Sequence, residues 1–440
     1  MAVTCARDNF SPMITRSRNL TTSRRGGEIL AAVGLGAALL LAGCSSSSQD
    51  GNGDSGTDSS PAPSVSLPSE PMGEERAAEI EALAAGVMEQ SGEEVPALLV
   101  GVWDPDDGVY TTALGKADLE SGDEAQVEDG FRIGSLTKTF IAALVLQQVD
   151  QGSLELDTPV AEYLPELSET YPDIGQVTVR QLLAMRSGLP DFEAVVTGSA
   201  AVDDTFTTKT WTAEDLIDAA MQSGEVTPAG QTPASYNNTN YILLGELLKA
   251  VTEQELPDLV TSELIDPFGL SRTVYPPADD TALAAPFLRG YVTASGMEAL
   301  TAAGGTLEPN TDTTDWTASW GGSAGIMSSA MDDLATWAGA DFGSVLLPES
   351  LQQERNTFES LAQAAPIGEY GLGLLKFGSW TGHTGSIPGW STLAMRDGDS
   401  GAIVVMAINS SGDVAATDQL LLLEGLYPGT TGLGEAPAEG

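Results

Sequence analysis

Cysteine and histidine are nearly absent from this chain of 440 residues. It has two cysteines, Cys5 and Cys44, and one histidine, His383. Cys5 lies in a segment that we expect to be removed, so the sequence excludes a disulfide framework, thiol catalysis and a zinc site built from cysteine and histidine. We therefore expect no metal and no cofactor.

Positive charge is also scarce. Lys and Arg together number 18 against 63 Asp and Glu, which gives a formal net charge of −45. A field of this sign disfavours nucleic acid as a partner and disfavours approach to anionic lipid. Adaptation to salt and general solubility both account for such an acidic chain.

The apolar run near the N-terminus is short. Residues 29–42 form 14 apolar or small residues, fewer than the roughly 20 that span a bilayer, and five arginines precede them. The run ends in Leu41-Ala42-Gly43-Cys44, which resembles a bacterial lipobox. We expect residues 1–43 to be a lipoprotein signal peptide, and Cys44 to be lipidated and to anchor an extracytoplasmic protein to the cell membrane. Residues 44–73, rich in Ser, Gly and Pro, predict a disordered tether.

The rest of the chain predicts a body over residues 74–427 and a flexible tail over 428–440. Strand patterns cover residues 96–104 and 108–118, joined by turn residues, and return after residue 373, whereas helical patterns fill the middle. Strands at both ends with helices between them predict an α/β (α+β) fold. One antiparallel sheet would be built from the N- and C-terminal parts and flanked by helices, with a helical lobe that shares a cleft with it.

The segment 131–152 organises this body. Apolar residues recur at helical spacing from Ser135 onward, which predicts one buried helix that begins at this serine. Lys138 follows three residues later on the same helical face, within reach of the hydroxyl. Free backbone N–H groups at the helix start could stabilise a developing anion there. A Ser-x-x-Lys spacing alone is also explained by an ordinary helix cap with an exposed lysine.

Two further motifs share this ambiguity. Tyr236 and Asn238 stand in a polar loop before a helix, where a phenolate beside an ammonium could act as a general base and where a helix cap is the plain alternative. His383-Thr384-Gly385 begins a predicted strand. There the glycine could let substrate approach the backbone, and the N–H of Ser386 could complete an oxyanion hole. The plain alternative is the corner of a hairpin.

With these motifs in this order, the chain resembles the serine β-lactamase and penicillin-binding-protein superfamily, in particular class C β-lactamases, D-Ala-D-Ala carboxypeptidases and related esterases. The resemblance runs from about residue 75 to 427. It implies a β-lactamase/transpeptidase-like fold, Ser135 as the acylated nucleophile, Lys138 as its activator and Tyr236 as the proton-transferring partner.

The resemblance also implies substrate-binding residues. Asn238 would bind the substrate amide and orient Lys138. His383 and Thr384 would line the strand on the leaving side, and the N–H groups of Ser135 and Ser386 would form the oxyanion hole. Relatives often carry a lysine in place of His383, and its positive charge helps attract the carboxylate of the substrate. A histidine titrates near about 6.5, so we expect this position to be neutral at pH 7 and to attract carboxylates as a cation only below about pH 6.

Three details depart from this pattern or compete with it. Met185 stands where many relatives have histidine, so we expect a structural hydrogen bond to be lost there. Ser323 lies in a G-x-S-x-G sequence, but the preceding segment is too polar for the strand that such an elbow needs. Ser400 mimics a trypsin-like loop that we interpret as a turn between strands.

We therefore expect a monomeric, exported serine hydrolase that acts through an acyl-enzyme, with D-Ala-D-Ala carboxypeptidase activity on cell-wall peptides as the first choice. A β-lactamase or small-ester hydrolase is the alternative. A non-catalytic penicillin or wall-peptide binder is the alternative from another class, and the Ser, Lys and Tyr set argues against it.

Overall fold

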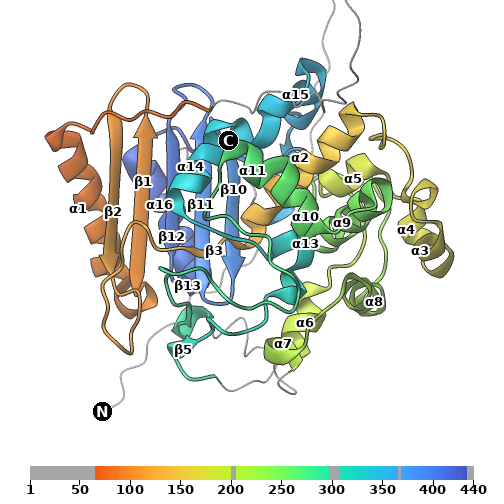
Figure 1. The fold of residues 1–440 in the computed structure, drawn as a ribbon, viewed down its shortest axis with the longest axis horizontal. Coiled ribbons are helices and arrows are strands. Elements are labelled where there is room, and N and C mark those ends of the chain that lie inside the picture. Colours follow the sequence, from red (N-terminus) through yellow and green to blue (C-terminus); the bar gives the residue numbers. More distant parts are fainter. Residues whose placement is uncertain (1–64, 200–204, 297–306, 365–367, 434–440) are drawn as a thin grey trace, which may run out of the picture. The chain divides into compact units, whose positions relative to one another are not determined.

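The structure, a computed structural model, describes residues 65–199, 205–296, 307–364 and 368–433 (Figure 1). The expected signal peptide, Cys44 and residues 44–64 of the expected tether lie outside the described residues. Within those ranges, no helix combines the length and the apolar character needed to cross a bilayer.

One large sheet dominates the described residues, and every pairing in it is antiparallel. Its strands, in spatial order, are β2 (Gly108–Gly115), β1 (Ala97–Asp104), β12 (Ile403–Ile408), β11 (Trp390–Asp397), β10 (Trp380–Ile387), β9 (Leu375–Phe377), β8 (Gly368–Tyr370) and β7 (Glu359–Ser360). Strand β1, from the N-terminal part, pairs with β12, from the C-terminal part, so that Leu98 lies opposite Ile408. This confirms the predicted sheet.

Helices cover both faces of this sheet. Every residue of strands β1 and β12 is buried, and all except Asp104 at the end of β1 are apolar or glycine, as expected for strands enclosed from both sides. Helices α14 (Met331–Gly339) and α16 (Asp413–Leu426) both contact β11 and β12, and α1 (Glu74–Ser91) contacts β1, β2 and α16.

The helical lobe is inserted between the two parts of the sheet, on the right in Figure 1. Its helices are α2 (Thr137–Asp150), α3 (Pro165–Thr170), α4 (Pro172–Gly175), α5 (Val179–Leu183), α6 (Glu193–Ser199), α7 (Thr205–Thr208), α8 (Ala213–Ser223), α9 (Thr239–Thr252), α10 (Leu256–Val260) and α11 (Asp266–Phe268). The short strand β3 (Phe131–Arg132) precedes α2 in the chain, and between α11 and α14 come β4 (Tyr291–Val292), β5 (Thr311–Asp312), α13 (Gly322–Gly325) and β6 (Ser328–Ser329). The remaining α-helix and strand among the described residues are α15 (Glu349–Arg355) and β13 (Ser410–Ser411).

The segment that carries the expected nucleophile begins differently from the prediction. Ser135 lies in a 3₁₀ turn, η2 (Gly134–Leu136), and the α-helix starts only at Thr137. Gly134 adopts a φ of +51°, which residues other than glycine rarely adopt. It turns the chain from β3 into this 3₁₀ turn. The helix α2 is otherwise buried as predicted.

The expected tether and tail are also shorter than predicted at their inner ends. Residues 65–73 lie against the body, where Val65 and Leu67 pack on the core and Met72 is buried, because these few apolar side chains have a surface to cover. At the other end Thr431 is buried and hydrogen-bonded to Glu424. The body therefore includes residues on both sides of 74–427.

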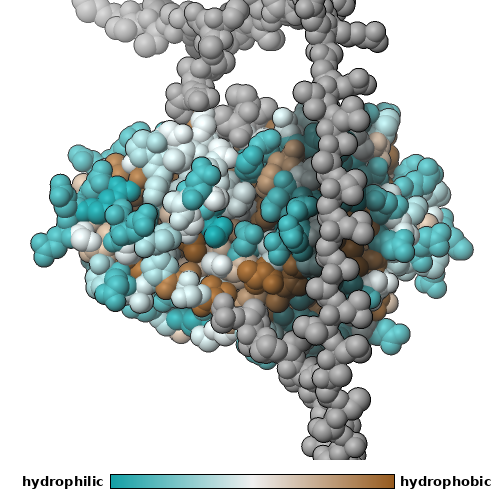
Figure 2. Space-filling view, turned by 90° about the horizontal axis from the view of Figure 1, so that it is seen from above, coloured by the Kyte–Doolittle hydropathy of each residue, from teal (hydrophilic) through white to brown (hydrophobic). Residues whose placement is uncertain are grey.

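Seen from above, the described surface carries mostly hydrophilic side chains at its two ends, with a smaller hydrophobic area near the middle (Figure 2). The helical patterns predicted for the middle of the chain are confirmed there, for example by α9 and by α10 and α11.

Candidate active site

The hydroxyl of Ser135 lies at the floor of a cleft of about 850 Å³ between the sheet and the helical lobe. Lys138, one turn along, donates a hydrogen bond from Nζ to Ser135 Oγ at 2.9 Å. It is fully buried, with 0% exposure, and also donates to Asn238 Oδ1 and to the Ala324 carbonyl, each at 2.8 Å. Burial lowers the pKa of Lys138 to about 7, against the opposing pull of the Asp191 and Glu193 carboxylates.

A lysine with this pKa exchanges its proton near neutral pH. The neutral amine can then take the proton of Ser135, and the ammonium can return it. The structure thus places the two residues of the Ser-x-x-Lys motif as an activated nucleophile needs them, even though the helix begins two residues later than expected.

Asn238 connects this lysine to two carboxylates. Its Nδ2 donates to Glu193 Oε2 at 2.8 Å and to Asp191 Oδ2 at 3.2 Å, while its Oδ1 accepts from Lys138. The backbone N–H of Asn238 also donates to Asp191, at 2.9 Å. These contacts fix the orientation of the amide, so its expected role in holding Lys138 has a structural basis, whereas its binding of substrate stays a prediction.

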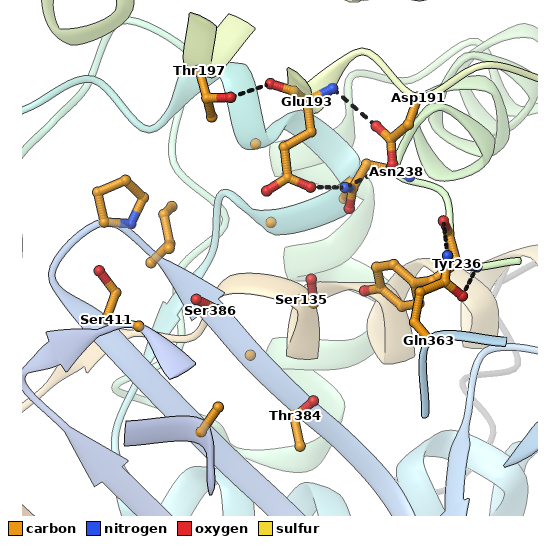
Figure 3. Close-up of a pocket in the computed structure, with 18 of the residues that line it drawn as sticks. Ser135, Asp191, Glu193, Thr197, Tyr236, Asn238, Gln363, Thr384, Ser386 and Ser411 are labelled. Carbon is orange, nitrogen blue, oxygen red and sulfur yellow. Dashed lines mark hydrogen bonds between the residues drawn. The ribbon is translucent and has the colours of Figure 1, made fainter. Parts of the chain in front are cut away.

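Tyr236 stands on the other side of the nucleophile. Figure 3 shows its hydroxyl pointing toward Ser135, and the ring lies 4.9 Å from Lys138 Nζ. The hydroxyl is buried and has no hydrogen-bond partner within bonding distance among the described residues. Burial raises the pKa of Tyr236 well above its usual value, so the phenol stays protonated. This corrects the expected phenolate base: Tyr236 can donate a proton, and Lys138 is the better base.

Strand β10 forms the opposite wall. The side chains of Thr384 and Ser386 face the cleft (Figure 3). A Cβ atom added to Gly134 would lie 2.8 Å from the backbone nitrogen and oxygen of Ser386, so the nucleophile turn and this strand nearly touch. This brings the backbones of Ser135 and Ser386 to the same end of the cleft, while the oxyanion hole expected from their N–H groups stays a prediction.

Gly385 lines the cleft, so its expected role in letting substrate approach the backbone stays a prediction. The structure adds a packing role, because a side chain on Gly385 would meet the Ile133 carbonyl at 2.0 Å and Thr392 Oγ1 at 2.3 Å. The glycine therefore lets β10 pack against the turn that carries Ser135.

His383 is the clearest correction. It is 1% exposed and lies outside the cleft lining, because neighbouring side chains of a strand point to opposite faces. Its Nδ1 bonds the Thr384 carbonyl and its Nε2 the Tyr370 hydroxyl, at 3.1 Å. Since a carbonyl only accepts, Nδ1 carries the proton and Tyr370 donates to Nε2. Burial lowers the pKa of His383 to about 3, so it does not become the expected cation below pH 6.

The acidic wall of the cleft was not predicted from the sequence. Asp191 and Glu193 line it together with Phe192, whereas none of the described lining residues is a lysine, arginine or histidine. The signal was present as two acids within three residues, just after the turn residues Leu189-Pro190. Gln363 was also missed, and its Oε1 accepts from the backbone N–H of Tyr236 at 2.9 Å.

Met185 retains part of the hydrogen bonding that we expected to be lost. It is buried, and its sulfur accepts weak hydrogen bonds from the Asn237 backbone N–H at 3.4 Å and from Asn240 Nδ2 at 3.6 Å.

The two competing serines lie elsewhere. Ser323 is buried in α13, follows a 3₁₀ turn and not a strand, and donates to the Tyr241 carbonyl at 2.8 Å. Ser400 lies in the turn between β11 and β12 and donates to Asp397. In the part of the chain that the structure describes, no group of three or more His, Cys, Asp or Glu could hold a metal ion.

Comparison with known proteins agrees with this geometry. The Beta-lactamase family model matches residues 80–426. Penicillin-binding protein 4 of Amycolatopsis lactamdurans is 30% identical over 175 residues, which are 40% of this chain and 43% of that protein. D-aminopeptidase of Cereibacter sphaeroides is 27% identical over 344 residues, which are 75% of this chain and 60% of that protein. This chain thus matches less than two thirds of either relative's length.

Solved structures match over more of their length. The D-amino acid amidase of Ochrobactrum anthropi SV3, complexed with L-phenylalanine amide, has a TM-score of 0.68 at 25% identity, over 80% of this chain and 97% of that one. A D-stereospecific amidohydrolase from Streptomyces sp. has a TM-score of 0.67 at 30% identity, over 81% of this chain and 99% of that one. The chain therefore belongs to the Beta-lactamase family, within the superfamily of serine hydrolases that includes the penicillin-binding proteins.

Proposed function

We propose that this protein is a serine amidase or aminopeptidase that cleaves an amide bond next to a D-configured residue, and that its substrate carries a free ammonium group on the acyl side of that bond. One observation carries the proposal: Glu193 and Asp191 line the cleft that holds Ser135, and no cationic side chain among the described residues lines it. Such a wall attracts an ammonium and repels a carboxylate. The D configuration is inferred from the D-aminopeptidase and the D-amino acid amidase among the similar proteins.

The chemistry follows from the positions of the side chains. Neutral Lys138 takes the proton of Ser135 as Oγ forms a bond to the carbonyl carbon, and the carbonyl oxygen becomes an anion beside the N–H groups of Ser135 and Ser386. Tyr236, which is protonated, passes a proton to the leaving nitrogen as the C–N bond breaks, and it recovers one from Lys138. Water then attacks the ester with the same groups in reversed roles.

Glu193 is the residue best placed to meet the ammonium. Its side chain is exposed in the cleft, and one of its carboxylate oxygens, Oε2, already accepts from Asn238. The other oxygen has no hydrogen-bond partner among the described residues and is open to a ligand. Asp191, by contrast, accepts hydrogen bonds from Asn238 on Oδ2 and from the backbone of Glu193 on Oδ1.

D-Ala-D-Ala carboxypeptidase activity is the second candidate, and the similarity to Penicillin-binding protein 4 favours it. The substrate of that reaction ends in a carboxylate, as β-lactams do. The cleft offers the hydroxyl of Thr384 to such a group but no positive charge among its described lining residues.

Turnover of matched substrates separates these activities. We expect the wild-type enzyme to hydrolyse D-phenylalanine p-nitroanilide, whose amine is free. Its kcat/KM should be at least about tenfold lower for the N-acetyl derivative, because the charged hydrogen bond to Glu193 is lost. Glu193→Gln should lower kcat/KM for the free amine by the same factor, for the same reason. Glu193→Gln should leave the N-acetyl substrate nearly unchanged. Faster release of D-alanine from an N-acylated D-Ala-D-Ala peptide than from amine-bearing substrates would favour the carboxypeptidase.

Mass spectrometry after exposure to a fluorescent penicillin or a fluorophosphonate tests the nucleophile. The adduct should map to Ser135, disappear in Ser135→Ala and persist in Ser323→Ala. An adduct on Ser135 that never turns over with any of these substrates would indicate a binder and not an enzyme.

A further inference from the structure

A continuous chain of hydrogen bonds joins the acidic wall of the cleft to the nucleophile. Glu193 Oε2 accepts from Asn238 Nδ2 at 2.8 Å, Asn238 Oδ1 accepts from Lys138 Nζ at 2.8 Å, and Lys138 donates to Ser135 Oγ at 2.9 Å. A single planar amide therefore separates a carboxylate that is open to ligands from an amine that is closed to solvent. A negative charge on Glu193 polarises the amide so that its oxygen becomes a better acceptor, and this favours the ammonium form of Lys138.

The other groups around Lys138 are not placed to compensate for a change at Glu193. Tyr236 and Tyr241 present ring faces at 4.9 and 5.6 Å, and both phenols stay protonated because burial raises the pKa of each. His383, on β10, stays neutral because burial lowers its pKa.

The remaining charge near the lysine is Asp191, whose hydrogen bonds to Asn238 and to the Glu193 backbone hold it in place. Full burial disfavours the charged form of Lys138, and the two carboxylates favour it. Burial is the stronger of these influences and brings the pKa of Lys138 to about 7, so both forms of the lysine are populated at neutral pH. A change in the charge of one carboxylate therefore alters the protonation of the lysine.

We propose that Glu193 is a positioning residue that couples occupation of the cleft to activation of the nucleophile: a cationic group bound to Glu193 offsets its charge and, through Asn238, drives Lys138 to release its proton. The activating ligand is the ammonium of the substrate itself, so this inference rests on the proposed function. As the ammonium binds, the proton passes from Lys138 through Ser135 Oγ, to which it is hydrogen-bonded and which lines the cleft, to water in the cleft. The free amine can then accept the proton of Ser135 when the substrate is attacked. The base is thus formed mainly in molecules that already hold an amine-bearing substrate.

The test uses an uncharged fluorophosphonate, whose reaction with Ser135 needs a basic Lys138 but no amine site. Its inactivation rate is measured against pH in wild type, in Glu193→Gln and in Glu166→Gln, a matched control on the exposed surface of α3. Each series is repeated with methylammonium and, as an uncharged control, with methanol.

We expect the acid limb of the rate profile to move to lower pH in Glu193→Gln and not in Glu166→Gln. At a fixed pH below the wild-type limb, each unit of displacement appears as about a tenfold faster inactivation. Methylammonium should move the wild-type limb in the same direction, methanol should not, and Glu193→Gln should respond to neither.

Identical limbs in wild type and Glu193→Gln would overturn the coupling. If kcat/KM for amine-bearing substrates still fell in that variant, the proposed function would stand without it. If the limb moved in Glu193→Gln but methylammonium had no effect and amine-bearing substrates were unaffected, the electrostatic link would hold while amine recognition, and with it activation by substrate, would fail.

Discussion

Lys138 donates to Ser135 at 2.9 Å from a position with no solvent exposure, and this combination sets the pH range of the chemistry. The pKa of Lys138 is lowered to about 7 from an ordinary value above 10, so the amine is neutral above about pH 7 and charged below it. Acylation should therefore rise with pH to a plateau, with an acid limb near 7. Lys138→Arg, whose guanidinium cannot release a proton, should lower the acylation rate about 10²–10⁴-fold at all pH values. An unchanged limb in that variant would assign the base elsewhere.

Tyr236→Phe separates catalysis from stability. The hydroxyl of Tyr236 is buried without a hydrogen-bond partner among the described residues, so its removal should not lower the free energy of unfolding and should raise it by up to about 1 kcal/mol. Acylation of an amide substrate should slow by about 10²-fold or more, because the leaving nitrogen loses its proton donor. Chemical denaturation and single-turnover kinetics measure the two effects, and a destabilised but fully active variant would contradict both.

His383 should govern stability in acid and not affinity for carboxylates. Its pKa falls from 6.5 to about 3 on folding, so between these values the unfolded chain binds the extra proton and stability decreases as pH falls. His383→Gln should flatten this part of the curve of unfolding free energy against pH. His383→Lys would bury a second cation near Lys138 and should cost about 3 kcal/mol or more, with no gain in binding a D-Ala-D-Ala peptide. A tighter carboxylate complex in His383→Lys would restore the first expectation.

Gly385→Ala should be severe although the residue has an ordinary backbone conformation. The added methyl group would press on the Ile133 carbonyl and on Thr392, and we expect a loss of about 3 kcal/mol and a displaced Ser135. Gly86→Ala in α1 is the matched control, because nothing lies within 4 Å of its added Cβ and alanine favours the helix by about 0.5–1 kcal/mol. Thermal unfolding and fluorophosphonate labelling compare the two, and equal effects would contradict this account.

Substitution of Cys44 tests the expected localisation at the membrane. We propose that it is lipidated and holds the protein at the membrane, so the protein should partition into detergent and Cys44→Ser should release it, since each buried CH₂ contributes about 0.8 kcal/mol. Retention of that variant on the membrane would show that the anchor, if any, lies elsewhere.

Most of the fold could be predicted because each strand and helix has its own local pattern of apolar and turn residues in the sequence. The apolar runs at 97–104 and 403–408 indicated strands, and the turn at 105–108 joins β1 and β2 as its residues require. The motif order placed Ser135, Lys138 and Tyr236, which the structure brings around one point.

What the sequence could not supply was the environment of each side chain. His383 and Thr384 are neighbours in the sequence, yet the strand turns one inward and the other into the cleft. Glu193 and Asn238 are far apart in the chain, so their contact, and the acidic character of the cleft, depend on tertiary packing that no local pattern records.

The pairing of β1 with β12 has a consequence for how the chain is made. The strand beside β1 is among the last segments to be synthesised, so the hairpin β1–β2 must wait for nearly the entire sequence before its inner edge is covered. A chain that stops before residue 403 would leave β1 and β11, two long strands that are largely buried in the native sheet, with unpaired edges on opposite sides of a gap. Truncation near the C-terminus, far from Ser135 in the sequence, would therefore yield aggregates and not a smaller hydrolase.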